Sequence, residues 1–114
     1  MSKHLKTLTP GTVQEVVHLA EEYHLGEKAG EGKGLNQRYL ALEGKVESLT
    51  DDQKDELLAL MWLGRGAAGE TVGMWAELLE NARHEDAEGK VGTLMIRASQ
   101  LGNYLPKGLE RLGA

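Results

Sequence analysis

The stretch TDDQKDELLALMWLGRG, residues Thr50 to Gly66, decides the fold class, because its apolar half suits either a buried strand or a buried helix. The run from Leu57 to Leu63 contains no β-branched residue. It continues without a break from a helix-start signal: Thr50 is the cap, two carboxylates follow near the positive end of the helix dipole, and Gln53 stands at the third position. We therefore predict a helix whose last two turns are apolar on all sides and are the most buried part of the protein.

The composition of the whole chain favours helices over strands. Leu occurs 19 times, Val and Ile together occur 7 times, and Phe is absent. Unbranched side chains lose little rotamer freedom in a helix, whereas strands favour β-branched and aromatic residues. A chain of 114 residues has the size of one domain with one core. We predict a compact all-α bundle over residues 1–114, a single domain of about five helices plus a short C-terminal helix.

Apolar residues at helical spacing mark the other helices. The first helix follows Thr9 and Pro10, a cap and a first-turn proline, and Gly26 is its predicted stop. Residues 26–34 hold four glycines among charged residues and predict a flexible Gly-rich loop. Two further helices are expected over residues 35–49 and 71–82. A last apolar face extends over residues 91–105, and Gly102-Asn103 is expected to break or bend it and to leave a short terminal helix over 104–112.

The charge and the missing residue types exclude several classes of function. The formal net charge of -5 and the pI near 5.3 argue against nucleic acid as a partner, because affinity for phosphate backbones comes from clustered Lys and Arg. The absence of Cys excludes a disulfide framework, a zinc-thiolate site and a thiol nucleophile. The sequence shows neither the apolar run of a signal peptide nor a stretch as long as a membrane span. We expect an acidic, soluble, cytoplasmic protein without a membrane partner.

Residues Gly64-Arg65-Gly66-Ala67-Ala68-Gly69 spell G-x-G-x-x-G, the spacing that cradles the pyrophosphate of a dinucleotide in some folds. That function requires a buried strand before the motif and alternating strands and helices around it. The sequence predicts neither, so no dinucleotide or other cofactor is expected. Gly64 is better explained as the residue just past the last helical turn, where the left-handed conformation favours glycine.

Arg65 leaves two hypotheses open. Because it stands between two glycines, its guanidinium can be displayed to bind a carboxylate or phosphate bidentately. The other hypothesis is a structural ion pair, with Glu70 or with an acidic residue of another helix. Trp62 and Trp75, which flank the turn, are predicted to be core anchors, although aromatic residues also serve at interfaces. The candidate binding residues are therefore Trp62, Gly64, Arg65, Gly66 and Trp75.

Neither a metal site nor a catalytic centre is expected. The pairs Glu15/His18 and Glu21/His24 both have the E-x-x-H spacing of di-iron carboxylate bundles. Those bundles draw their ligands from four helices, whereas here both pairs lie on one helix and point in different directions. The four His residues lie in predicted helices or near a terminus, without a strained nucleophile turn beside them, so no Ser-His-Asp centre is assigned.

Three segments carry a resemblance: Glu56 to Gly66, Trp75 to Ala82 and Leu101 to Leu109. Together they resemble a family of small bacterial proteins, the domain-of-unknown-function family numbered thirty-seven seventy-five, with W-L-G-R-G as the most specific part. This sequence departs from the family pattern at Ala67 and Asn103, where the family often has acidic residues. The resemblance covers roughly residues 49–109 and implies no activity. It implies that the candidate binding residues form one unit.

The sequence thus predicts a non-enzymatic helical module for interaction or regulation in the bacterial cytoplasm. Its expected surface surrounds the turn between Trp62 and Trp75, and its expected partner is another protein or a second copy of the chain in a homodimer. The alternative is a small-molecule or anion-binding protein, an enzyme included. In that alternative Arg65 and the backbone amides near Gly66 hold a carboxylate or phosphate.

Overall fold

The computed structural model, which describes residues 4–30, 32–66 and 69–113, is built from helices joined by short turns. The described residues contain no strand, so the all-α prediction is confirmed. The helices are α1 (Pro10–Ala29), α2 (Lys33–Ser48), α3 (Asp51–Arg65), α4 (Trp75–Arg83), α5 (Ala87–Ile96) and α6 (Leu101–Leu112), with short 3₁₀ turns η1 (Val72–Met74) and η2 (Ala98–Gln100).

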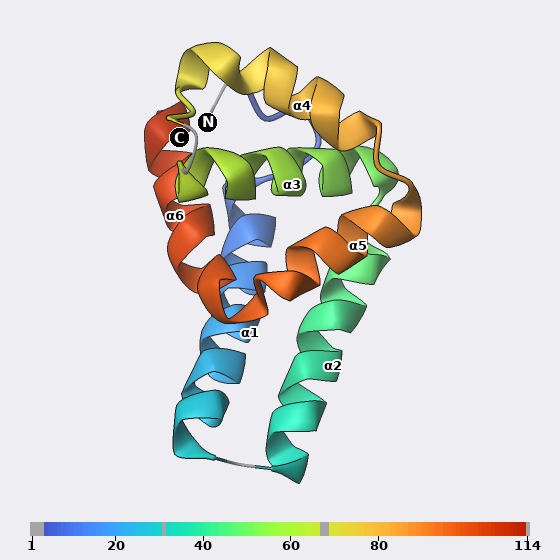
Figure 1. The fold of residues 1–114 in the computed structure, drawn as a ribbon, viewed down its shortest axis with the longest axis vertical. Coiled ribbons are helices and arrows are strands. Elements are labelled where there is room, and N and C mark those ends of the chain that lie inside the picture. Colours follow the sequence, from blue (N-terminus) through green and yellow to red (C-terminus); the bar gives the residue numbers. More distant parts are fainter. Residues whose placement is uncertain (1–3, 31, 67–68, 114) are drawn as a thin grey trace.

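Helix α3 lies in the middle of the fold (Figure 1). Helix α4 lies above it in that view, α5 lies below it, and α6 runs past its C-terminal end, while α1 and α2 form a hairpin that extends away from it. Packing between elements is most extensive between α3 and α6. Every residue of α3 from Lys54 to Met61 is buried, and so are Leu63 and Gly64. The predicted burial of this helix is confirmed, because its neighbours cover it on several sides.

The predicted start of α3 is confirmed in atomic detail. The backbone N–H of Gln53 donates to Oγ1 of Thr50 over 3.1 Å, and the backbone N–H of Thr50 donates to Oε1 of Gln53 over 2.9 Å. This reciprocal pair is a capping box, which satisfies two backbone donors that the helix itself leaves free. The run from Leu57 to Leu63 is therefore helical, and the strand alternative is excluded.

The predicted end of α3 at Gly64 is wrong, because Gly64 lies inside the helix and faces α6. A Cβ on Gly64 would lie 1.7 Å from the carbonyl oxygen of Tyr104, and a Cβ on Gly108 would lie 2.3 Å from the carbonyl oxygen of Leu60. Both distances are far below van der Waals contact, so the two helix backbones touch where each lacks a side chain. The helix ends instead at Gly66, which has a left-handed φ of 62°.

The predicted loop over residues 26–34 is too long. Helix α1 continues through the buried Gly26 to Ala29 and ends at Gly30, and α2 begins at Lys33. Contacts across the α1–α2 hairpin account for the extra helical turn, since packing overrides the low helix propensity of a glycine. They include an edge-to-face contact between Tyr23 and Tyr39, with ring centroids 5.5 Å apart.

The predicted break at Gly102-Asn103 is also wrong. Helix α5 ends at Ile96, the 3₁₀ turn η2 follows, and α6 runs from Leu101 to Leu112 with Gly102 and Asn103 in its first turn. A Cβ on Gly102 would lie 2.8 Å from Cγ of Glu21 on α1. Gly102 therefore permits close packing of α6 on α1 rather than ending a helix, and the last helix is longer than predicted.

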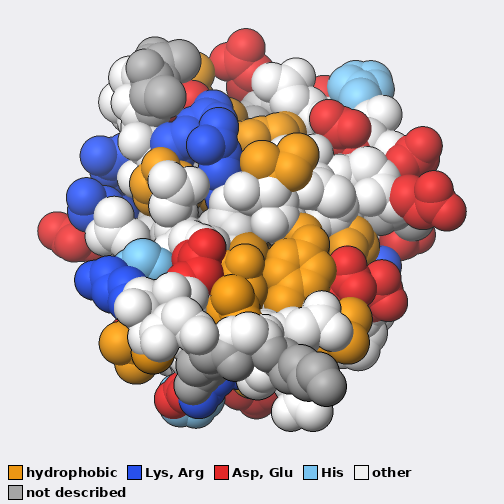
Figure 2. All heavy atoms as spheres, turned by 60° about the horizontal axis from the view of Figure 1, so that its bottom comes forward, with side chains coloured by type: hydrophobic (Ala, Val, Ile, Leu, Met, Phe, Trp, Pro, Cys, Tyr) orange, Lys and Arg blue, Asp and Glu red, His pale blue; other side chains and the backbone are white. Residues whose placement is uncertain are grey.

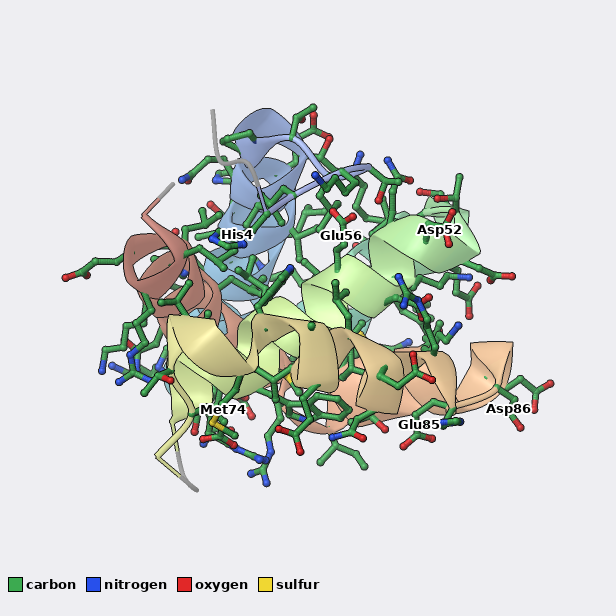
Figure 3. The ribbon with its side chains drawn as sticks, turned by 90° about the horizontal axis from the view of Figure 1, so that it is seen from above. His4, Asp52, Glu56, Met74, Glu85 and Asp86 are labelled. Carbon is green, nitrogen blue, oxygen red and sulfur yellow. The ribbon has the colours of Figure 1, made fainter. Side chains whose placement is uncertain are left out.

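The segment before α1 is fixed to α3 by the carboxylate of Glu56. The backbone N–H groups of Lys6, Thr7 and Leu8 donate to its two oxygens over 3.0–3.2 Å. Figure 3 shows Glu56 pointing from α3 toward this segment. Glu56 is only 4% exposed, so its charge is stabilised by these donors in place of water. The indole N–H of Trp75 donates to the carbonyl oxygen of His4 over 3.3 Å, which fixes the same segment to α4.

Glu56→Gln is expected to lower the free energy of unfolding by about 2 kcal/mol, because the amide offers fewer acceptor sites and turns an NH₂ group toward backbone donors. Denaturant unfolding measures this change, and amide hydrogen exchange at Thr7 and Leu8 should accelerate in the same variant. Glu110→Gln, at an exposed position on α6, is the control and should change the free energy by less than about 0.5 kcal/mol. Equal stability and equal exchange in both variants would contradict the role given to Glu56.

Candidate functional site

The five candidate binding residues do not form one accessible site. Gly64 is buried beneath α6, and Trp75 is buried with its indole N–H bonded to the backbone of His4. Trp62 is half-buried against the core, which confirms its expected place there. Arg65 and Gly66 are half-exposed at the end of α3, and residues 67 and 68 of the motif lie outside the described residues.

Two backbone amides of the turn after α3, those of Gly66 and Gly69, donate hydrogen bonds within the chain. Gly66 N–H donates to the carbonyl oxygen of Trp62 over 3.0 Å, and Gly69 N–H donates to that of Gly66 over 3.1 Å. The guanidinium of Arg111 lies against Gly66 and donates to the carbonyl oxygen of Leu63. Arg111 is not predictable from the sequence, because a contact between two helices so far apart in the chain leaves no local signal.

The structural ion pair predicted for Arg65, with Glu70 or with an acidic residue of another helix, is not found among the described residues. No carboxylate of the described residues lies within ion-pair distance of it, and its Nε is buried without a hydrogen-bond partner among those residues. A hollow of about 430 Å³ lies beside the turn and is lined in part by Gly66, Arg111 and the buried Glu70. The hollow is therefore lined by groups of both charges.

A larger hollow of about 530 Å³ lies between α2 and α5, and we call it the α2–α5 groove. Helix α3 contributes its floor through Lys54. The full set of lining residues is Tyr39, Glu43, Glu47, Lys54, Glu88, Val91, Gly92, Met95 and Ile96. The groove therefore combines an apolar centre with three carboxylates and one ammonium.

Helical periodicity explains why these residues face the groove. Tyr39, Glu43 and Glu47 follow one another at intervals of four along α2, and the pairs Glu88/Gly92 and Val91/Met95 have the same interval on α5. Apart from the neighbouring residues and backbone of its own helix, no atom lies within 4 Å of the position that a Cβ on Gly92 would occupy, so the α5 side of the groove is open at that point.

Ile96 is the most exposed large apolar side chain of the described residues, at 79% exposure. Figure 2 shows hydrophobic side chains gathered in the middle of one face of the molecule, with acidic side chains prominent on its right side. Helical spacing predicts the helices that carry Tyr39, Val91 and Met95, but it does not single out Ile96 or the three glutamates. A signal was present, because Ile96 is an apolar residue outside the periodic face of its helix.

A buried ion pair fixes the position of α5, one wall of the groove. The Nζ of Lys90 lies 2.7 Å from Oδ1 of Asp55, and the two side chains are 8% and 7% exposed. A charge buried to this degree requires its partner, so α5 is held in one register against α3.

On α2, the other wall of the groove, Tyr39 packs against Tyr23 of α1. The pKa of Tyr23 is raised above its ordinary value, first by burial and then by the charges of Glu27 and Tyr39.

Lys54 lies at the floor of the groove and is 8% exposed. No carboxylate of the described residues lies within 4.0 Å of its ammonium. A lysine in this setting covers apolar surface with its aliphatic stem and keeps its charged end at the remaining opening. Its three N–H donors are consequently available to a molecule that enters the groove.

The two E-x-x-H pairs do not come together. His18 pairs with Glu22 over 3.9 Å and His24 with Glu27 over 3.6 Å, both on the surface of α1. Within the described part of the chain, no group of three or more His, Asp or Glu side chains is placed to hold a metal ion. No helix in residues 4–30, 32–66 and 69–113 combines the length and the low polarity needed to span a lipid bilayer.

Comparison with known proteins identifies a family and no further relative. No curated protein and no solved structure matches the chain. The family model described as "Protein of unknown function (DUF3775)" matches residues 39–114, which include α3, α4, α5, α6 and most of α2. This match confirms the resemblance found in the W-L-G-R-G segment and extends it on both sides. The chain therefore belongs to the DUF3775 family.

Proposed function

We propose that the protein is a non-enzymatic interaction module of the bacterial cytoplasm, which binds a partner protein in the α2–α5 groove. The observation that carries this proposal is the exposure of Ile96 at the rim of a hollow whose other apolar residues are Tyr39, Val91 and Met95. Exposed apolar surface with a polar rim is typical of protein-binding sites. The buried ion pair between Lys90 and Asp55 holds α5, one wall of the groove, against α3, which forms the floor. The site is therefore preorganised for binding.

The chemistry of the groove supports binding more than catalysis. Its titratable groups are three glutamates, one lysine and one tyrosine, without a histidine or a nucleophile activated by a neighbouring base. The charge of the groove also favours a different protein as the partner rather than a second copy of the chain. A symmetric dimer through this face would place the glutamates of one copy opposite those of the other, and like charges across an interface are unfavourable.

The test is site-specific photo-crosslinking in cells, with benzoylphenylalanine in place of Ile96. We expect one discrete adduct, because the probe would stand at the rim of the occupied groove. The same probe in place of Val72, another exposed apolar residue, is the control and should give no such adduct.

Filling the groove distinguishes a specific partner from chance capture. Gly92→Leu places a side chain in the open space of α5 and should abolish the adduct at position 96, whereas Gly44→Leu, at a helical glycine with equally open surroundings, should retain it. An adduct that forms equally at positions 72 and 96, or that survives Gly92→Leu, would contradict the proposal.

An anion site at the end of α3 is the second candidate function. The Nε of Arg65 favours it, because this buried guanidinium nitrogen has no acceptor among the described residues, which is unusual. It ranks second because the amides of Gly66 and Gly69, the described donors nearest to Arg65 in the turn, already have acceptors.

Sulfate titration followed by thermal unfolding separates the two candidates. If an anion binds at Arg65, sulfate should raise the Tm of the wild type in a saturable way. Arg65→Ala should lose this rise in Tm, and Arg83→Ala, an exposed control on α4, should retain it. We expect equal, non-saturating shifts in all three proteins. A saturable shift that depends on Arg65 would favour the anion site over the groove.

A further inference from the structure

We propose, resting on the interaction function proposed above, that the α2–α5 groove receives the C-terminal end of a basic amphipathic helix of the partner protein. In this arrangement the apolar residues of the helix pack on the centre of the groove. The basic residues of its last turns meet the glutamate rim, and its free carbonyl oxygens meet Lys54. Each of these contacts follows from a separate feature of the groove.

The rim determines the charge of the partner. Glu43 and Glu47 stand on the α2 side and Glu88 on the α5 side. None of the three forms an ion pair within the described part of the chain, so their charges are available to an incoming molecule. Three carboxylates against one ammonium give the groove a net negative charge. A partner with Lys or Arg flanking its apolar residues is complementary to it.

Lys54 determines which part of a helix fits. Lys54 lines the groove and is 8% exposed, and its ammonium has no carboxylate partner among the described residues. In the middle of a helix the carbonyl oxygens are bonded within the helix, whereas the last four are free and carry the negative end of the helix dipole. A helix C-terminus also favours basic side chains. The same end of a helix therefore matches both the Lys54 ammonium and the surrounding carboxylates.

The apolar centre determines the remaining part of the contact. Val91 and Met95 lie one helical turn apart on α5 and face Tyr39 across the groove, with the open position of Gly92 beside them. This geometry admits side chains at i, i+3 and i+4 of a helix, which is how an amphipathic helix binds in a groove. The thioether of Met95 adapts to irregular apolar shapes.

The same features exclude other occupants. Nucleic acids and anionic lipid surfaces carry phosphate groups, which the glutamate rim repels. A second copy of the chain would present the same acidic groove. The basic residues of its own α6 do not supply the required helix, since the apolar face of α6 is buried in the core.

Synthetic peptides test the class of partner directly. Two 14-residue helical peptides share one stripe of leucines, and their polar positions hold only Lys in one and only Glu in the other. Titration into ¹⁵N-labelled protein is followed by NMR. We expect the Lys peptide to shift the amide signals of Val91, Gly92 and Ile96, with an affinity that falls as salt increases, and the Glu peptide to leave them unchanged.

Variants and a spin label test the contacts. Lys54→Met and Glu47→Gln should each weaken binding of the Lys peptide by about tenfold, whereas Glu77→Gln, at an exposed position on α4, should not. A nitroxide at the C-terminal end of the Lys peptide should broaden the Gly92 signal more than one at its N-terminal end. Stronger broadening from the N-terminal label would overturn the assigned orientation.

The outcomes separate this inference from the proposed function. The crosslinked adduct at residue 96 could form although the Lys peptide does not bind, or although the Glu peptide binds equally well. Either result would overturn the proposed class of partner and would leave the interaction function standing. Absence of the adduct would remove the interaction function itself. An adduct with twice the mass of the chain would identify a second copy as the occupant and overturn the inference.

Discussion

The backbone contact between α3 and α6 is the constraint on which the rest of the fold depends. Gly64 of α3 and Gly108 of α6 each face a carbonyl oxygen of the other helix at a distance that leaves no room for a Cβ. Close approach of two backbones increases the dispersion contacts of the side chains around them, including the fully buried Leu60 and Leu105. Helices α4 and α5 also pack directly on α3, whereas α1 packs on α6 and on α2 (Figure 1).

Three consecutive residues of α3 connect this core to the candidate site. Successive residues on a helix point about 100° apart, so Lys54, Asp55 and Glu56 face different neighbours. Lys54 reaches the α2–α5 groove, Asp55 pairs with Lys90 of α5, and Glu56 binds the segment before α1. All three are buried, which is unusual for charged side chains. Their burial is possible because Lys54 lines the groove, Asp55 has the ammonium of Lys90 and Glu56 has backbone N–H donors. The helix that organises the core also sets the position of the groove.

Local signals predicted much of the architecture. The cap at Thr50, the unbranched apolar run that follows it and the W-L-G-R-G segment were sufficient to predict a buried helix and the family. The glycines were misinterpreted, because a local rule treats glycine as a helix stop. Gly64 and Gly102 stand where two helices approach each other, and only the arrangement of those helices reveals that role. The groove was missed for a similar reason, since it depends on how α2 and α5 are placed across α3.

The central claim is that glycine at position 64 serves the contact between helices rather than a ligand or a turn. The most direct measurement compares the free energies of unfolding of Gly64→Ala and Gly44→Ala, two equal substitutions inside helices. Apart from the neighbouring residues and backbone of its own helix, no atom lies within 4 Å of the position that a Cβ on Gly44 would occupy, so alanine there should stabilise the protein by up to about 1 kcal/mol. Gly64→Ala should destabilise it by about 3 kcal/mol or more, because α6 must move away from α3. Equal stabilisation by both substitutions would contradict the account.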